Sequence, residues 1–131
     1  MFTGSKIKSV KGVRNKEGPL EGLNVNIAIE GVEQRGEAVE VKFDYTADYR
    51  KQMAIIKIKG SLFFKEDLAF AEKIKQAFDE TKGMPPDFLK VVLNTANYIC
   101  GVEAALLTET LGLKPPLFPM KISKLEENAG S

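Results

Sequence analysis

Apolar and polar residues alternate along most of the first half of the chain. Successive side chains on a strand point to opposite sides, so this alternation predicts strands with one buried and one solvated face. The predicted strands cover residues 6–14, 23–30, 39–48 and 54–62. Residues 31–36, which begin and end with glycine, predict a hairpin turn, and irregular spacing predicts a bulge near Gly12. The pattern therefore predicts an antiparallel sheet with one face open to water.

The spacing of apolar residues changes after residue 65. Intervals of three and four predict a short helix over residues 66–81, which ends at Gly83. Pro86 suits the first turn of a second helix, which continues to about Leu111 and would be roughly 39 Å long. The predicted fold class is therefore α+β: a four-stranded antiparallel sheet followed by a short helix and a long C-terminal helix.

The predicted long helix is apolar on more than one side. One stripe comprises Phe88, Val91, Val92, Thr95, Ile99, Val102 and Leu106. A second stripe beside it comprises Leu89, Leu93, Ala96, Cys100, Ala104, Leu107 and Leu111. A single sheet cannot cover so much of a helix. Either a second protomer covers the rest, which we favour, or the proline-rich segment that follows the helix does so within one chain.

We expect a homo-oligomer, a dimer or a tetramer, that assembles through this helix. The predicted interface residues are Asn94, Asn97, Ile99 and Val102. The two asparagines lie in a stretch without charged residues between Lys90 and Glu103, and they would be the polar positions that fix the register of the contact.

Composition and charge limit the number of domains, the classes of partner and the cellular compartment that we expect. Its 131 residues predict one domain over residues 1–131, with loose residues from about 123. The net charge of +1 gives no general attraction to nucleic acid or an anionic membrane, and the single cysteine fits a reducing compartment. The first residues lack the apolar stretch of a signal peptide, and residues 91–111 are too polar for a lipid-facing span. We therefore expect a cytoplasmic protein.

Candidate catalytic chemistry is sparse in this sequence. The chain has no histidine, which removes the commonest general base and metal ligand, and one cysteine cannot build a typical zinc site. Carboxylate pairs such as Asp44 with Asp48 remain, but their place on the solvated face of a strand explains them. Cys100 lies on an apolar helix face, where a small core residue is expected. We predict no catalytic residue, no metal and no cofactor.

The first strand is basic. Its cationic residues are Lys6, Lys8, Lys11, Arg14 and Lys16. A nucleic-acid site would be expected to interleave aromatic residues for base stacking, and this stretch has none. Lysines also protect the edge of a sheet from pairing with other chains, and we favour this explanation.

The order of the elements, together with two short motifs, resembles the SecB-like fold. The motifs are MPPDFL, which opens the long helix, and LGLKPPLFPMKI, which follows it. The resemblance spans about residues 6–122 and implies a tetrameric, ATP-independent chaperone that holds unfolded chains in apolar grooves. Export chaperones of that family are acidic and dock onto the Sec translocation motor. The net charge of +1 here predicts weak or absent docking, and a general or toxin–antitoxin-associated holdase fits equally.

The function predicted from the sequence is that of an ATP-independent holdase for unfolded polypeptides. The predicted client-binding residues are Phe63, Phe64, Leu117, Phe118 and Met120. The three prolines around Phe118 keep its segment out of a helix or a central strand, so we expect it to form one wall of a cleft. The alternatives are a scaffold domain for one dedicated partner and, less favoured, an enzyme that uses carboxylates.

Overall fold

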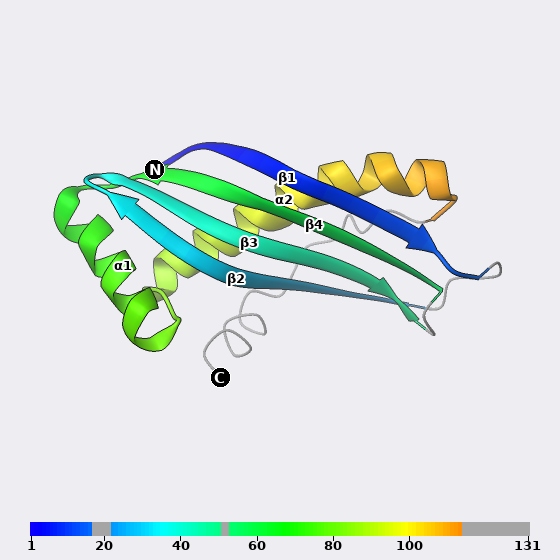
Figure 1. The fold of residues 1–131 in the computed structure, drawn as a ribbon, viewed down its shortest axis with the longest axis horizontal. Helices are drawn as coiled ribbons and strands as arrows, with labels where there is room; N and C mark the ends of the chain where they lie inside the picture. Colours follow the sequence, from blue (N-terminus) through cyan, green and yellow to red (C-terminus); the bar gives the residue numbers. More distant parts are fainter. Residues whose placement is uncertain (17–21, 51–52, 114–131) are drawn as a thin grey trace.

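The computed structural model describes residues 1–16, 22–50 and 53–113, which form one sheet and two helices. The elements are β1 (Phe2–Arg14), β2 (Leu23–Arg35), β3 (Ala38–Tyr49), β4 (Ala54–Lys65), α1 (Leu68–Thr81) and α2 (Pro86–Leu111). Figure 1 shows α2 running behind the sheet and α1 beyond the end at which β2 turns into β3. The predicted α+β fold class is confirmed, although all four strands are longer than the alternation indicated.

The strands lie in the order β1-β4-β3-β2, and every neighbouring pair is antiparallel. The first strand therefore joins the sheet beside the last strand, while β2, β3 and β4 follow one another as hairpins. This order makes β1 and β2 the two edges of the sheet. The basic first strand is thus an edge strand, as the explanation of its lysines requires.

Two predictions about turns and bulges are wrong. The hairpin turn between β2 and β3 is confined to Gly36 and Glu37, with Gly36 in the left-handed region at φ 59°. Gly31 lies within β2, next to a register shift that follows Ile29. The shift explains the misplaced turn, because one additional residue interrupts the alternation that the sequence pattern relies on.

No bulge occurs at Gly12, which pairs in regular register with Ile56. The irregularities of β1 lie earlier, between Phe2 and Gly4 and between Ile7 and Ser9. Gly12 instead makes room for α2, because a Cβ atom at this position would lie 2.5 Å from the Cδ2 atom of Leu107.

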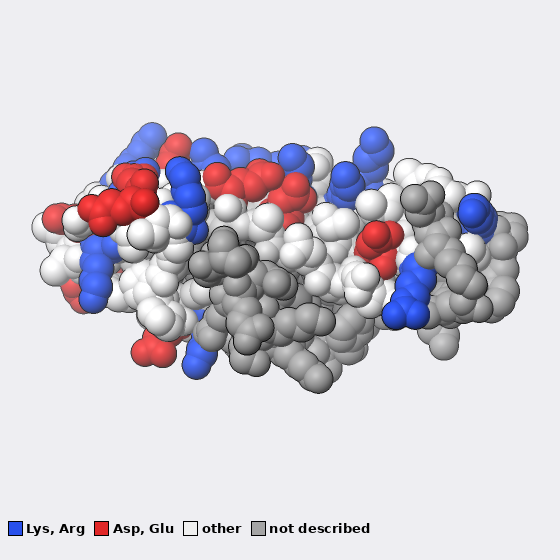
Figure 2. Space-filling model, turned by 90° about the horizontal axis from the view of Figure 1, so that it is seen from below, with Lys and Arg blue, Asp and Glu red and all other residues white. Residues whose placement is uncertain are grey.

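The core lies between the sheet and α2. Odd-numbered residues of β3 from Val39 to Tyr49 are all buried, and the even-numbered ones face the other side, called here the outer face. Charged side chains on this outer face form the upper rim of the molecule in Figure 2. β2, β3 and β4 each bury residues on the core side, as their alternation predicted, whereas no residue of the edge strand β1 is buried.

Both ends of α2 are fixed to the sheet. Near its start, the Phe88 ring packs edge-to-face against Phe64, with ring centroids 4.9 Å apart. At its end, Arg14 of β1 donates hydrogen bonds from Nη1 to the carbonyl oxygens of Leu111 (3.0 Å) and Gly112 (2.7 Å). A cation at this position also complements the negative end of the helix dipole.

The length of α2 and its mean hydropathy of 1.3 would suffice to cross a membrane, but the core helix of a soluble protein passes the same test. Its buried side is packed against the sheet along the whole helix. The buried residues are Phe88, Leu89, Val92, Leu93, Ala96, Cys100, Gly101, Ala104 and Thr108. We therefore treat α2 as a core helix.

α1 begins and ends with defined caps. The Asp67 carboxylate accepts a hydrogen bond from the Phe70 backbone N–H at 2.9 Å. The prediction that Gly83 ends the helix is wrong by one residue, because Lys82 takes the left-handed conformation at φ 61° and donates its backbone N–H to the Phe78 carbonyl at 2.8 Å. The Lys82 ammonium lies 5.1 Å from the centre of the Phe78 ring, a cation–π contact that accompanies this strained conformation.

Candidate polypeptide-binding groove

An apolar groove runs along the β2 edge of the sheet, between this strand and α2. We call it the β2 groove. It has a volume of about 300 Å³ and is lined by Asn26, Ile27, Ala28, Ile29, Lys82, Gly83, Met84, Leu89 and Leu93. Three elements meet here: the middle of β2, the link between the helices and the first two turns of α2. The groove therefore combines a strand edge with an apolar floor.

The backbone edge of β2 lies along this groove. Among the described residues, no strand pairs with β2 on the side away from β3. Nearer the hairpin, Lys75 of α1 donates from Nζ to the Val32 carbonyl at 2.9 Å and so covers that part of the edge. The stretch from Asn26 to Ile29 lies beyond this contact. Four residues of strand offer roughly 13 Å of backbone to an added strand.

The floor of the groove comes from side chains that are only partly used by the core. Ile27 and Leu89 are buried, whereas Ile29 and Met84 are half-buried and pack against the edge of the core. Methionine adapts its shape to different neighbours, which suits a surface that contacts varied side chains. The groove can therefore take up apolar side chains without opening the core.

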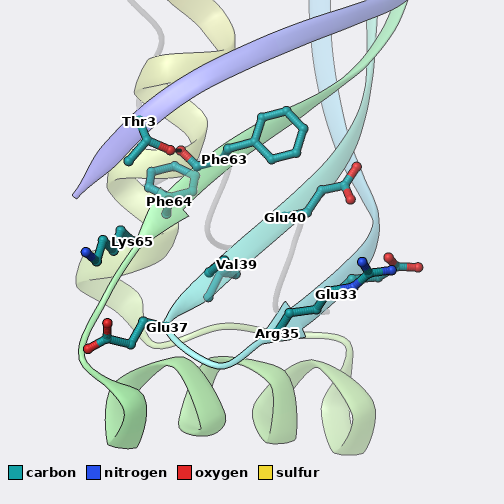
Figure 3. Close-up of a pocket in the computed structure, with 10 residues that line it drawn as sticks. Thr3, Glu33, Arg35, Glu37, Val39, Glu40, Phe63, Phe64 and Lys65 are labelled. Atoms are coloured by element: carbon teal, nitrogen blue, oxygen red, sulfur yellow. Dashed lines mark hydrogen bonds between the residues drawn. The ribbon is translucent and has the colours of Figure 1, made fainter.

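A second hollow lies on the outer face of the sheet near the β2–β3 turn, with a volume of about 710 Å³ (Figure 3). Phe63 contributes an aromatic ring, and most of the other lining residues are charged: Glu33, Arg35, Glu37, Glu40 and Lys65. The Lys42 ammonium donates a hydrogen bond to Glu33 at 3.1 Å, which lowers the pKa of that carboxyl. Glu40 accepts a hydrogen bond from the buried Ser61 hydroxyl at 2.6 Å. Apolar side chains also line this hollow, among them Val39 and Phe64.

Two of the predicted client-binding residues, Phe63 and Phe64, border the hollow on the outer face of the sheet. Phe63 is half-buried on the outer face, whereas Phe64 is 2% exposed and packs between the rings of Phe2 and Phe88. Adjacent residues of a strand point to opposite faces, so the ring of Phe64 belongs mainly to the core. The remaining predicted residues, Leu117, Phe118 and Met120, lie outside the described residues.

The predicted interface residues lie on different sides of α2. Val102 is 47% exposed and Asn94 is also exposed, but Ile99 is half-buried against the core. Asn97 is half-buried, and its Oδ1 atom has no hydrogen-bond partner within the described part of the chain. The exposed apolar residues of the helix form what we call the outer stripe: Val91, Tyr98, Val102 and Leu106.

The sequence analysis did not predict the residues of the β2 groove as a binding site. Alternation identified the strand that contains Ile27 and Ile29, but it could not show that this strand lies at an edge of the sheet. The MPPDFL motif was the available signal, since Met84 and Leu89 are its first and last residues and both line the groove.

No acid–base or metal chemistry gathers in the described part of the chain, where no group of three or more His, Cys, Asp or Glu side chains could hold a metal ion. Cys100 is fully buried on the side of α2 that packs against the sheet, and burial raises the pKa of its thiol to about 12. A neutral, inaccessible thiol is a core group and not a nucleophile.

Comparison with known proteins rests on structure alone. No protein-family model matches the chain, and no curated protein matches its sequence. A solved structure of the Mycobacterium tuberculosis SecB-like chaperone Rv1957, in complex with a ChAD peptide from the HigA1 antitoxin Rv1956, is similar with a TM-score of 0.61. The similarity covers 92% of this chain and 88% of that chain, at 16% sequence identity. The fold is SecB-like.

The SecB-like fold confirms the resemblance drawn from the element order and the two motifs. Most of the chain takes part in it, so the match includes the sheet and both helices and not only a common hairpin. The similar protein is a SecB-like chaperone that was solved with a bound peptide. At this identity the comparison establishes the fold, and the function needs its own argument.

Proposed function

We propose that this protein is an ATP-independent holdase that binds unfolded polypeptides in the β2 groove. The observation that supports it most is the SecB-like fold over 92% of the chain, in which an open strand edge lies beside an apolar floor. The similar chaperone was solved with a peptide of an antitoxin, which indicates that extended protein segments are a suitable class of ligand for this fold.

Binding would use the backbone and the side chains of the client at once. An extended client pairs its main chain with the free edge of β2 from Asn26 to Ile29. Its alternate side chains then point toward the floor made by Met84 and Leu89. Burial of one Leu or Phe side chain contributes roughly 1.5–3 kcal/mol, and the backbone hydrogen bonds are independent of sequence. Such a site accepts many clients with moderate affinity.

The proposal includes assembly through α2. The outer stripe exposes large apolar side chains, among them Tyr98 at 74% and Leu106 at 64%. From Val91 to Leu106 it extends roughly 22 Å along the helix, enough for a second copy of α2 to pack alongside. Assembly would place several β2 grooves on one particle, and a long client could then bind at more than one of them.

Suppression of aggregation tests the proposal. We expect the protein to reduce light scattering by denatured rhodanese on dilution, without added nucleotide. Replacement of Ile29 and Met84 by Ser should weaken this protection at least several-fold. The matched control Leu68→Ser, at a 51% exposed position on α1 outside the groove, should protect as well as the parent. If the groove variant and the control protect equally, the groove is not the client site.

The predicted role of Phe118 is tested separately, because its segment lies outside the described residues. We expect Phe118→Ser to weaken client binding while leaving the thermal midpoint almost unchanged. A loss of roughly 3 kcal/mol or more in unfolding free energy would instead identify Phe118 as a core residue. Protection of several unrelated denatured proteins distinguishes a holdase from a scaffold that binds one dedicated partner.

A further inference from the structure

Lysine side chains gather on one half of the outer face of the sheet, over β1 and β4. The strand register places Lys6, Lys11, Lys57 and Lys59 on this face. Its acidic side chains lie on the other half, where Glu33 pairs with Lys42. Among the described residues, only Lys59 reaches across, with Nζ 3.8 Å from carboxylate oxygens of Glu30 and Asp44. The half of this face over β1 and β4 therefore carries lysines and no acidic side chain, whereas the half over β2 and β3 carries both signs of charge.

Lys11 and Lys57 lie directly opposite each other on paired strands. Cross-strand neighbours have Cβ atoms about 5 Å apart, and like charges at that distance destabilise a sheet. Both side chains are exposed, and neither forms an ion pair within residues 1–16, 22–50 and 53–113. The repulsion between the two lysines destabilises the free protein. An anionic ligand that binds between them would relieve this repulsion, so the pair favours anion binding.

An apolar hollow lies next to this lysine pair. It has a volume of about 280 Å³ and is lined by Lys11, Val13, Asn15, Ile55 and Lys57. Val13, which is 39% exposed, lies opposite Ile55, two residues along each strand from the lysines. Two residues of strand span roughly 6.6 Å. The site thus presents a double positive charge and, one such step away, an apolar depression lined by Val13 and Ile55.

We propose that this site binds an extended acidic peptide segment of a partner protein. The segment carries a carboxylate and an apolar side chain two residues apart, because an extended peptide repeats with the same 6.6 Å step as the strands beneath it. The carboxylate lies over Lys11 and Lys57, and the apolar side chain fills the hollow between Val13 and Ile55. The site is on the half of the sheet opposite the β2 groove, so it does not depend on the proposed function.

The observations favour a peptide over other anionic macromolecules. Phe63 is the aromatic residue that the outer face of β1 and β4 carries within the described part of the chain, and it does not line this hollow, so nucleic-acid bases have no ring there on which to stack. Val13 and Ile55 are the two apolar residues that line the hollow, whereas binding to a membrane surface depends on a broad apolar face. A discrete charge and a discrete hollow at a fixed step match a short peptide.

Fluorescence anisotropy with a labelled peptide Gly-Glu-Ser-Leu-Ser-Glu-Gly tests the proposal on the full chain. We expect saturable binding that weakens with added sodium chloride, since exposed charges are screened. Two control peptides, with Gln in place of Glu or Ser in place of Leu, should each bind about tenfold more weakly. The variant Lys11→Thr with Lys57→Thr should lose about tenfold in affinity while its thermal midpoint stays the same or rises.

Lys59→Thr is the matched control, because Lys59 lies one step along β4 but already has two acidic neighbours. It should bind the peptide like the parent. Equal losses in Lys59→Thr and in the double variant would overturn the proposal, as would absence of binding or indifference to the Leu-to-Ser change. Tighter binding of a single-stranded oligonucleotide, or of phosphatidylserine-containing vesicles, would assign the site to those ligands instead.

Discussion

The two sides of α2 are both apolar, but they differ in the size of their residues. From Ala96 onward, the side against the sheet is built from small residues, with Ala96, Cys100 and Ala104 all 0% exposed. The outer stripe carries larger ones, including Tyr98 and Leu106. Small residues let the helix approach the large rings of β3, such as Phe43 and Tyr45. The large residues of the outer stripe project away from the sheet. In this part of the helix, residue size separates the two sides more clearly than hydrophobicity does.

The largest effect is expected on the outer stripe. Val102→Asp with Leu106→Asp should convert the proposed oligomer to a monomer, because a buried and unpaired carboxylate costs several kcal/mol. Sedimentation velocity at micromolar concentration measures the change. These positions are better probes than Ile99, whose side chain also packs against the core of its own protomer.

The matched control for the outer stripe is Leu68→Asp on α1, which adds a charge at another exposed apolar position. It should leave the oligomer intact. A parent protein that sediments as a monomer would contradict the assembly and would mean that the outer stripe is exposed in solution.

On the side against the sheet, a larger residue should be harmful. Ala96→Leu adds volume to a position with no exposed surface, and we expect a loss of about 2–3 kcal/mol in unfolding free energy. Urea denaturation measures it. Lys90→Leu, at an exposed position of the same helix, is the control for helix propensity and should have little effect. If Ala96→Leu left the unfolding free energy unchanged, the helix would not pack closely on the sheet.

The Cys100 thiol reports on the same contact through pH. Burial raises its folded-state pKa to about 12, above the ordinary value of 9.0. Above about pH 9 the unfolded chain loses this proton first, so the thiol's contribution to stability is full below pH 9 and is lost toward pH 12. The slope is at most roughly 1.4 kcal/mol per pH unit. Cys100→Ala should show a shallower decline in unfolding free energy between these limits, and equal slopes would contradict the burial of the thiol.

The smallest effect is expected at Tyr45, beneath α2. Its hydroxyl is buried and has no hydrogen-bond partner among the residues described, and burial, with a smaller contribution from Cys100, raises its pKa. A buried polar group without a partner is destabilising. Tyr45→Phe should therefore raise the unfolding free energy by about 1 kcal/mol. A loss of stability would show that the hydroxyl has a partner.

Alternation and helical periodicity were enough to predict every strand and helix, because each element buries one face against a single core. The order of the strands was not predictable in this way, since alternation gives a strand its faces but not its neighbours. The open edge of β2, and with it the groove, depends on that order. The pair Phe63 and Phe64 borders one hollow, but alternation along the strand places only Phe63 on the outer face and leaves the Phe64 ring in the core.

The two apolar stripes of α2 were visible in the sequence, but the assignment of interface residues within them was only partly informative. Val102 lies outward, whereas Ile99 belongs mainly to the protomer. α2 is long and crosses a twisted sheet, so the side of the helix that faces the sheet changes along its length. Residues three positions apart, such as Ile99 and Val102, can therefore have different surroundings. The small residues at 96, 100 and 104 were the signal that marked the inner side.

The hydrogen bond from Arg14 to Leu111 joins residues 97 positions apart. This separation has a consequence for folding during synthesis on the ribosome. β1 is made first, but it can pair only with β4 and be fastened only by the last turn of α2. At roughly 5–20 residues per second, its partner strand follows several seconds later. During that interval β1 has no partner strand. Its lysines disfavour pairing with the β1 strand of another nascent chain on the same messenger RNA.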